Sequence, residues 1–188
     1  MKLHFFIASL LMLTSCQDKP AAKEEPVAQE KPSKPQKKEV VSEKKEVKPT
    51  SLKETYKSQA ESLISKIEGN AAVEEIDKLS QNLTKTGLAM IPVLIKLHPE
   101  CTKYLTAILK VGPTLHTLSL EEIESGYHAD GKLPKMSSPT CYHGKDLVVH
   151  PATVTAMAKA GLSDRESAKH EIQEVIAHLG EVHLEKKN

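Results

Sequence analysis

The residue types best suited to chemistry gather between residues 127 and 151. This stretch holds three of the nine histidines, two of the four tyrosines and one of the three cysteines. Imidazole nitrogen and thiolate sulfur are common ligands of Zn²⁺ and Cu²⁺. The candidate ligands are His128, Cys141, His143 and His150. Their spacing matches no strong metal or haem motif. A Zn²⁺, Cu²⁺ or haem site at His128, His143 and His150 is therefore the second hypothesis for this stretch.

The first hypothesis is a binding surface on a long loop. Apolar-periodic sequence flanks residues 127–151, but no helical period runs through them. A long segment without regular structure is usually functional or disordered, and recognition residues concentrate on loops held by a rigid scaffold. In a purely structural alternative, these side chains bond backbone groups that a loop leaves unpaired. The candidate surface residues are Tyr127, His128, Asp130, Tyr142, His143 and His150.

Signals for catalysis are weak, and no catalytic residue is assigned. Cys141 with His143 or His150 could form a nucleophile and base, but the flanking residues match no cysteine-hydrolase signature. The chain has no G-x-S-x-G motif and no phosphate-binding glycine loop. Its 26 basic and 25 acidic residues nearly cancel, so it lacks the basic field typical of nucleic-acid binding. A binding or accessory role is favoured over an enzyme.

The N-terminus has the layout of an export signal. Lys2 precedes a largely apolar run that ends at Leu13, which is too short to span a membrane. The sequence Leu-Thr-Ser-Cys that ends at Cys16 resembles the lipobox of bacterial lipoproteins. The resemblance covers residues 1–16 only. It implies a signal peptide over 1–15, cleavage before Cys16, and attachment of acyl chains to that cysteine. An ordinary secreted protein is the alternative.

The resemblance also implies a location and a partner. The lipid bilayer would hold the protein through Cys16, facing the cell envelope. In bacteria with two membranes, an Asp directly after the lipidated cysteine tends to retain a lipoprotein at the inner membrane. Here that position is Gln17, which favours the outer membrane, facing the periplasm. An envelope protein or the cell wall is the expected partner of the globular domain.

Residues 16–50 are predicted to form a disordered tether. From Gln17 to Thr50 there is no Leu, Ile, Met or aromatic residue, and Lys, Glu and Pro dominate. Such a segment cannot bury enough apolar surface to offset the entropy of ordering it. The tether would let the globular part, residues 51–188, work at a distance from its membrane.

Residues 51–188 are predicted to form an all-α, small irregular helical bundle. There is no Trp and both phenylalanines lie in the first six residues, so the core must be aliphatic. Apolar residues recur at three- and four-residue intervals. Ser119 and Ser163, each followed three residues later by Glu, form capping-box patterns. The expected helices cover about 51–68, 71–86, 88–97, 99–112, 120–125, 151–160 and 164–184.

Two further predictions concern side chains. Cys101 and Cys141 are an even pair in an exported chain, which favours a disulfide between them; free thiols, or Cys141 as a metal ligand, are the alternatives. On the last helix, a polar stripe is predicted to be a solvated face, because a di-iron centre would need Glu-x-x-His motifs that the chain lacks. The stripe consists of Glu171, Glu174, His178 and Glu181.

Overall fold

A computed structural model describes residues 49–185. The expected signal peptide, the lipidation site at Cys16 and nearly all of the tether lie outside these residues. Every regular element in the described part is helical, which confirms the all-α prediction. The elements are α1 (Pro49–Glu68), α2 (Val73–Leu97), η1 (Pro99–Cys101), α3 (Thr102–Val111), η2 (Gly112–Thr117), α4 (Leu120–Ile123), η3 (Glu124–His128), α5 (Pro139–Lys159) and α6 (Arg165–Glu181).

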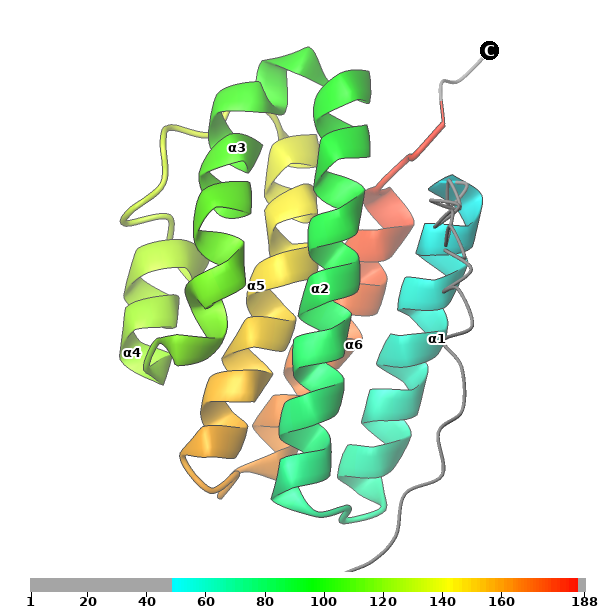
Figure 1. Ribbon diagram of the computed structural model, residues 1–188, viewed down its shortest axis with the longest axis vertical. Helices are drawn as coiled ribbons and strands as arrows, with labels where there is room; N and C mark the ends of the chain where they lie inside the picture. The colour runs from blue at the N-terminus through cyan, green and yellow to red at the C-terminus, as the bar shows by residue number, and fades with distance from the viewer. Residues whose placement is uncertain (1–48, 186–188) are drawn as a thin grey trace, which may run out of the picture. The chain divides into compact units, whose positions relative to one another are not determined.

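Four long helices pack side by side. Helix α2 lies between α1 and α5, and α6 closes the group by contacting both α5 and α1. Helices α3 and α4 lie beside α5, on the side away from α1 (Figure 1). The core is aliphatic, as expected, and includes Leu83, Ile91 and Ile172. Among residues 49–185, no helix combines the length and the apolar character needed to cross a membrane.

Helix α5 corrects the prediction of a long loop over residues 127–151. The chain is helical through His128, and α5 begins at Pro139, so the irregular connection is confined to 129–138. The apolar run at 147–149 is helical, not extended, and no separate helix begins at Pro151. Every residue from Gly144 to Ala156 is buried. A helix covered on all sides has no solvent-facing stripe, so its sequence shows no amphipathic period.

Helix α2 is continuous where two helices were expected. It runs through Gly87 and Pro92 without a break. Gly87 is buried, and a Cβ there would lie 2.3 Å from the carbonyl oxygen of Leu147 on α5. The glycine therefore allows two backbones to approach closely and does not end the helix. Pro92 is on the exposed side.

The helix ends agree in part with the capping predictions. Ser119 and Glu122 form the expected capping box at the start of α4. The second predicted box, from Ser163 to Glu166, does not form: the N-cap of α6 is Asp164, whose carboxylate accepts from the backbone N–H of Ser167.

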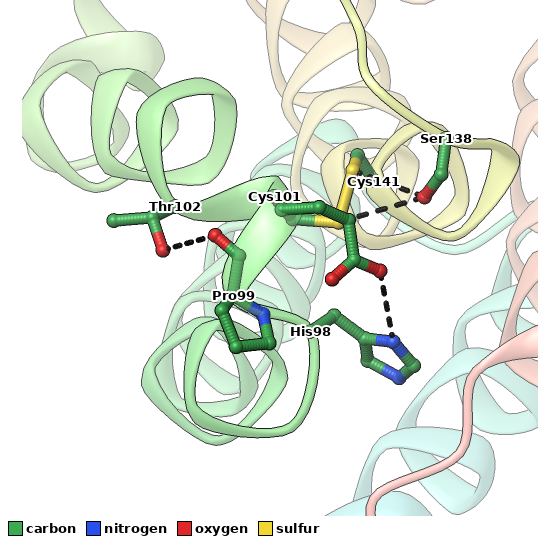
Figure 2. Close-up of a disulfide and its surroundings, with 7 residues drawn as sticks. His98, Pro99, Cys101, Thr102, Ser138 and Cys141 are labelled. Carbon is green, nitrogen blue, oxygen red and sulfur yellow. Dashed lines mark hydrogen bonds and ion pairs between the residues drawn. A yellow bond between two sulfur atoms is a disulfide. The ribbon is translucent and has the colours of Figure 1, made fainter.

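The predicted disulfide joins Cys101, in η1, to Cys141, in the first turn of α5. Both cysteines are fully buried. Figure 2 shows Ser138 turned toward the sulfur atoms, with its Oγ 3.3 Å from Sγ of Cys141 and 3.8 Å from Sγ of Cys101. The bridge fixes the start of α5, and the residues just after it belong to the polar cluster described next.

Candidate metal centre

A cluster of polar side chains lies between the two C-terminal helices. On α5, Asp146 and His150 are four residues apart, so they lie on one helix face, and His150 is only 1% exposed. On α6, Glu171, Glu174 and His178 recur at helical spacing and face α5. Because α5 is the most enclosed helix, it brings these ionisable groups into the interior of the domain.

Three of these side chains converge on one point. Nε2 of His178 lies 3.5 Å from Oδ2 of Asp146, and Nε2 of His150 lies 3.9 Å from Oδ1 of Asp146. One ligand atom from each of the three residues lies within 4.8 Å of the others, close enough to hold a metal ion. We call Asp146, His150 and His178 the inner group.

The other nitrogen of each imidazole is already engaged. Nδ1 of His150 lies 2.6 Å from Oε2 of Glu171, and Nδ1 of His178 lies 2.8 Å from Nδ1 of His143. If each inner imidazole carries its proton on Nδ1, it donates outward and turns the lone pair of Nε2 toward Asp146. A hydrogen-bond acceptor behind each histidine is the usual arrangement around protein-bound metals.

Lys145 suggests a purely structural explanation for the cluster. Its buried ammonium lies 3.0 Å from Asp146 Oδ1 and 3.3 Å from Asp130 Oδ1, and it donates to the carbonyl oxygen of His128. The contact with Asp146 is close, but its geometry makes no hydrogen bond. Both carboxylate oxygens of Asp146 and Nε2 of His150 are buried without a hydrogen-bond partner. The Lys145 ammonium accounts for Oδ1 of Asp146 as an ion pair. Such groups are normally satisfied, so Oδ2 of Asp146 and Nε2 of His150 are the two atoms that the Lys145 ion pair leaves unexplained.

A second set of possible ligands shares His150. His128, His150 and Glu171 also offer ligand atoms within 4.8 Å of one another; we call them the outer group. Nδ1 of His128 lies 3.1 Å from Oε2 of Glu124. Glu124 and Glu171 both line a cavity of about 360 Å³ that also contacts Thr153. The outer group therefore lies near solvent.

Burial and neighbouring charges shift the pKa values in the centre. Burial opposes protonation of His150, but the hydrogen bond to Glu171 and the surrounding carboxylates outweigh it and raise the pKa. Burial lowers the pKa of His178, and the neighbouring imidazoles add to this effect. Burial, the charge of Asp146 and the closeness of the phenol hydroxyl to that carboxylate raise the pKa of Tyr142 to about 12, although the hydroxyl makes no geometric hydrogen bond to it. At neutral pH, Tyr142 is therefore a neutral phenol and His178 offers a neutral imidazole.

The centre includes some of the expected residues and excludes others. His128, His143 and His150 do come together, but His143 supports His178 and is in neither ligand group. Cys141 is in the disulfide and cannot be a ligand. His150 is buried, so its assignment to a surface was wrong. Tyr142 contacts the rings of His143 and His178.

Two expected surface residues lie outside the ligand groups. Tyr127 packs near the ammonium of Lys132. Asp130 accepts a hydrogen bond from the hydroxyl of Tyr104 at 2.6 Å.

The polar stripe of the last helix is not the solvated face that was expected. The side chains of Glu171 and His178 are only 18% and 15% exposed, whereas Glu181 is exposed. Asp146 was missed altogether. The spacing of Asp146 and His150, four residues apart in a run of apolar residues, is the signal that could have found it.

Comparisons with protein-family models, curated proteins and solved structures found no significant match to this chain. What the protein does must therefore be inferred from the chemistry of the cluster between α5 and α6.

Proposed function

We propose that this protein is a lipid-anchored envelope protein whose helical domain binds a divalent transition-metal ion, Zn²⁺ or Cu²⁺. The inner group, Asp146, His150 and His178, would supply the ligands. This ligand set differs from the one expected from sequence, which combined three histidines and no carboxylate.

One observation carries the proposal. The two oxygens of Asp146 and Nε2 of His150 are buried and lack hydrogen bonds, and Nε2 of His178 faces the same carboxylate. Leaving a buried polar group unsatisfied costs about 1–3 kcal/mol, and more for a charged group. The Lys145 ammonium pairs with Oδ1 of Asp146 without a hydrogen bond, and a metal ion coordinated by Asp146 and His150 would offset the cost of the atoms that remain unsatisfied. The hydrogen bonds behind both imidazoles support the same arrangement.

The ligand types favour particular metals. Imidazole nitrogen suits Zn²⁺ and Cu²⁺, whereas Cu⁺ prefers thiolate and thioether sulfur. The cysteines nearest the centre, Cys101 and Cys141, are joined to each other. Three protein ligands leave at least one coordination position for water or a fourth ligand.

Haem is a less suitable ligand for this centre. The rings of His128 and His150 have centroids 4.9 Å apart, and those of His150 and His178 lie 5.2 Å apart. A porphyrin bound by any two of these histidines would have to separate rings that now contact each other inside the buried core. A bare ion needs no such rearrangement.

The envelope location is supported by the N-terminal sequence. The short apolar run and the lipobox-like residues ending at Cys16 support export and lipidation, and the Lys/Glu/Pro-rich tether suits a domain held near a membrane. Two or three acyl chains would anchor far more firmly than one. Replacing Cys16 by Ala should move the protein from the membrane fraction to the soluble fraction. Retention in the membrane fraction would contradict the anchor.

Zn²⁺ binding by the purified protein tests the metal site. Isothermal titration should show tight uptake, and Asp146→Asn and His178→Ala should each abolish it while circular dichroism shows the helices retained. His116→Ala, at an exposed histidine away from the centre, should bind as the wild type does. No uptake by the wild type, or full uptake by the Asp146 and His178 variants, would contradict the proposal.

A further inference from the structure

We propose that the centre binds a second metal ion at the outer group, so that His150 bridges two ions through its two ring nitrogens. The inference rests on the proposed function, because the first ion would occupy the inner group. The second ion would be held by His128, Nδ1 of His150 and Glu171.

The two nitrogens of His150 face different ligands. Nε2 faces Asp146, whereas Nδ1 faces the carboxylates of Glu171, at 2.6 Å, and Glu174, at 3.7 Å. The ring of His128 meets that of His150 edge-on, with the centroids 4.9 Å apart. Each group of three ligands therefore has its own nitrogen of His150, and both groups can be filled at once.

His128 repeats the pattern seen at the inner histidines. Its Nδ1 is engaged by Glu124, and Glu124 is itself held by a hydrogen bond from Thr153 to its other oxygen. If Nδ1 carries the proton, Nε2 of His128 is left as the ligand atom. His128 and His178 thus each have an outward partner at Nδ1, and a partner of this kind orients metal-bound imidazoles.

Charge on the outer side of His150 favours a cation. The carboxylates of Glu124, Glu171 and Glu174 pair with imidazoles. The carboxylates of Glu171 and Glu174 place negative charge around Nδ1 of His150, which a bound cation would neutralise. The ammonium of Lys145 neutralises the opposite side, next to Asp146 and Asp130.

The outer group also has access to solvent. The side chain of His128 is 32% exposed, and the cavity lined by Glu124 and Glu171 reaches this side of the cluster. A hydrated ion could enter there without unfolding of α5. The outer ion should therefore exchange faster than the inner one.

Binding of the second ion replaces a proton. The Nδ1–H bond of His150 breaks, the proton leaves to solvent, and a bond from Nδ1 to the metal forms. No electrons are transferred. Glu171, which accepts that proton's hydrogen bond in the singly loaded centre, becomes a ligand of the second ion. Metal binding that displaces ligand protons depends on pH and releases protons in proportion.

Titration of the purified protein with Cu²⁺, followed by electron paramagnetic resonance, tests the bridge. The first equivalent should give the signal of an isolated Cu²⁺ ion. The second should bind with release of a proton and should reduce that signal, because two Cu²⁺ ions joined through one imidazolate couple antiferromagnetically. In His128→Ala the second equivalent should be lost and the first retained, and in His116→Ala both should remain.

The possible results separate the two proposals. Uptake of one equivalent that is lost in His178→Ala supports the inner site and overturns the bridge. A second equivalent that survives in His128→Ala, or that adds an uncoupled signal, also overturns the bridge. No uptake at all overturns the proposed function itself. Zn²⁺ titrations of the same variants, with proton release followed in two buffers, give a measurement of stoichiometry that is independent of the spectroscopy.

Discussion

Nδ1 of His143, in the first turns of α5, lies 2.8 Å from Nδ1 of His178, on α6. A hydrogen bond between two imidazole nitrogens requires one to donate and the other to accept. When His178 donates from Nδ1, its Nε2 is free to face Asp146, and His143 is the accepting partner. In that tautomer, one contact between two helices leaves Nε2 of His178 available to a metal.

His143→Ala should therefore weaken metal binding without removing a ligand. Loss of such an outer partner typically costs 10–100-fold in metal affinity, and we expect a decrease of about that size for Zn²⁺. Competition with a chromophoric chelator measures it. The stoichiometry should stay at the wild-type value, with His116→Ala as the control. An unchanged affinity would show that His178 needs no partner to orient it.

Lys145→Met should destabilise the metal-free protein and make its stability depend on metal. Removing one member of a buried ion pair costs about 3–5 kcal/mol, because the other charge is left uncompensated, and here Asp146 is that charge. Zn²⁺ should restore part of the loss in urea unfolding. Asp146→Asn in the same chain should recover stability without metal and remove the response to Zn²⁺. If Zn²⁺ leaves the free energy of unfolding of Lys145→Met unchanged, Asp146 is not a ligand.

Replacing Cys101 and Cys141 together by Ala should lower the free energy of unfolding by about 4 kcal/mol, from the loop entropy of a bridge that spans 40 residues. Urea unfolding under oxidising conditions measures the difference. A reducing agent should destabilise the wild type to a similar extent and leave the double variant unchanged. Equal stability of the wild type with and without reductant would contradict the prediction.

Gly87→Ala and Gly180→Ala should change stability in opposite directions. Both glycines lie inside helices, where alanine is favoured by about 1 kcal/mol. At Gly87 the new Cβ would meet the backbone of Leu147 at 2.3 Å, whereas at Gly180 it would meet nothing within 4 Å. Overpacking against backbone typically costs 1–3 kcal/mol, so Gly87→Ala should be destabilising and Gly180→Ala stabilising. Thermal unfolding of the two variants, compared with the wild type, provides the test.

The capping box at α4 should be visible in the titration of Glu122. Hydrogen bonds from the backbone N–H and the hydroxyl of Ser119 lower the pKa of Glu122 below its ordinary value. The ionised Glu122 therefore stabilises the fold at pH values above the pKa that Glu122 has in the unfolded chain. This stabilisation is lost as the pH falls through the lower pKa of Glu122 in the folded protein. Ser119→Ala removes the hydroxyl but keeps the backbone N–H, which is the larger cause, so it should raise the pKa of Glu122 part of the way toward its ordinary value, as measured by NMR. A pKa unchanged from the wild type would show that the hydroxyl contributes nothing.

Local signals in the sequence were enough for several features. The helical period identified α1 and α6, and the serine at 119 marked the start of α4, because amphipathic stripes and caps depend on residues close together in the chain. Cys101 and Cys141, the two cysteines that remain after Cys16, indicated a disulfide, which the structure confirms. These features could be predicted without knowing which helices pack against each other.

Two errors came from helices whose surroundings the sequence does not show. Gly87 was interpreted as a helix stop, because a glycine that admits a neighbouring backbone looks the same in sequence as one that ends a helix. The segment now assigned to α5 was interpreted as a loop, because burial on all sides removes the polar stripe that reveals a helix.

By itself, the sequence determined an all-α domain and favoured the disulfide between Cys101 and Cys141, and its first 16 residues predict export and lipidation. Only the tertiary structure decided which polar residues meet. Asp146 and His178 are 32 positions apart in the chain, and the packing of α6 against the buried helix α5 places Nε2 of His178 3.5 Å from Oδ2 of Asp146. Coordination depends on such distances between side chains of different helices, and no local pattern of residues encodes them.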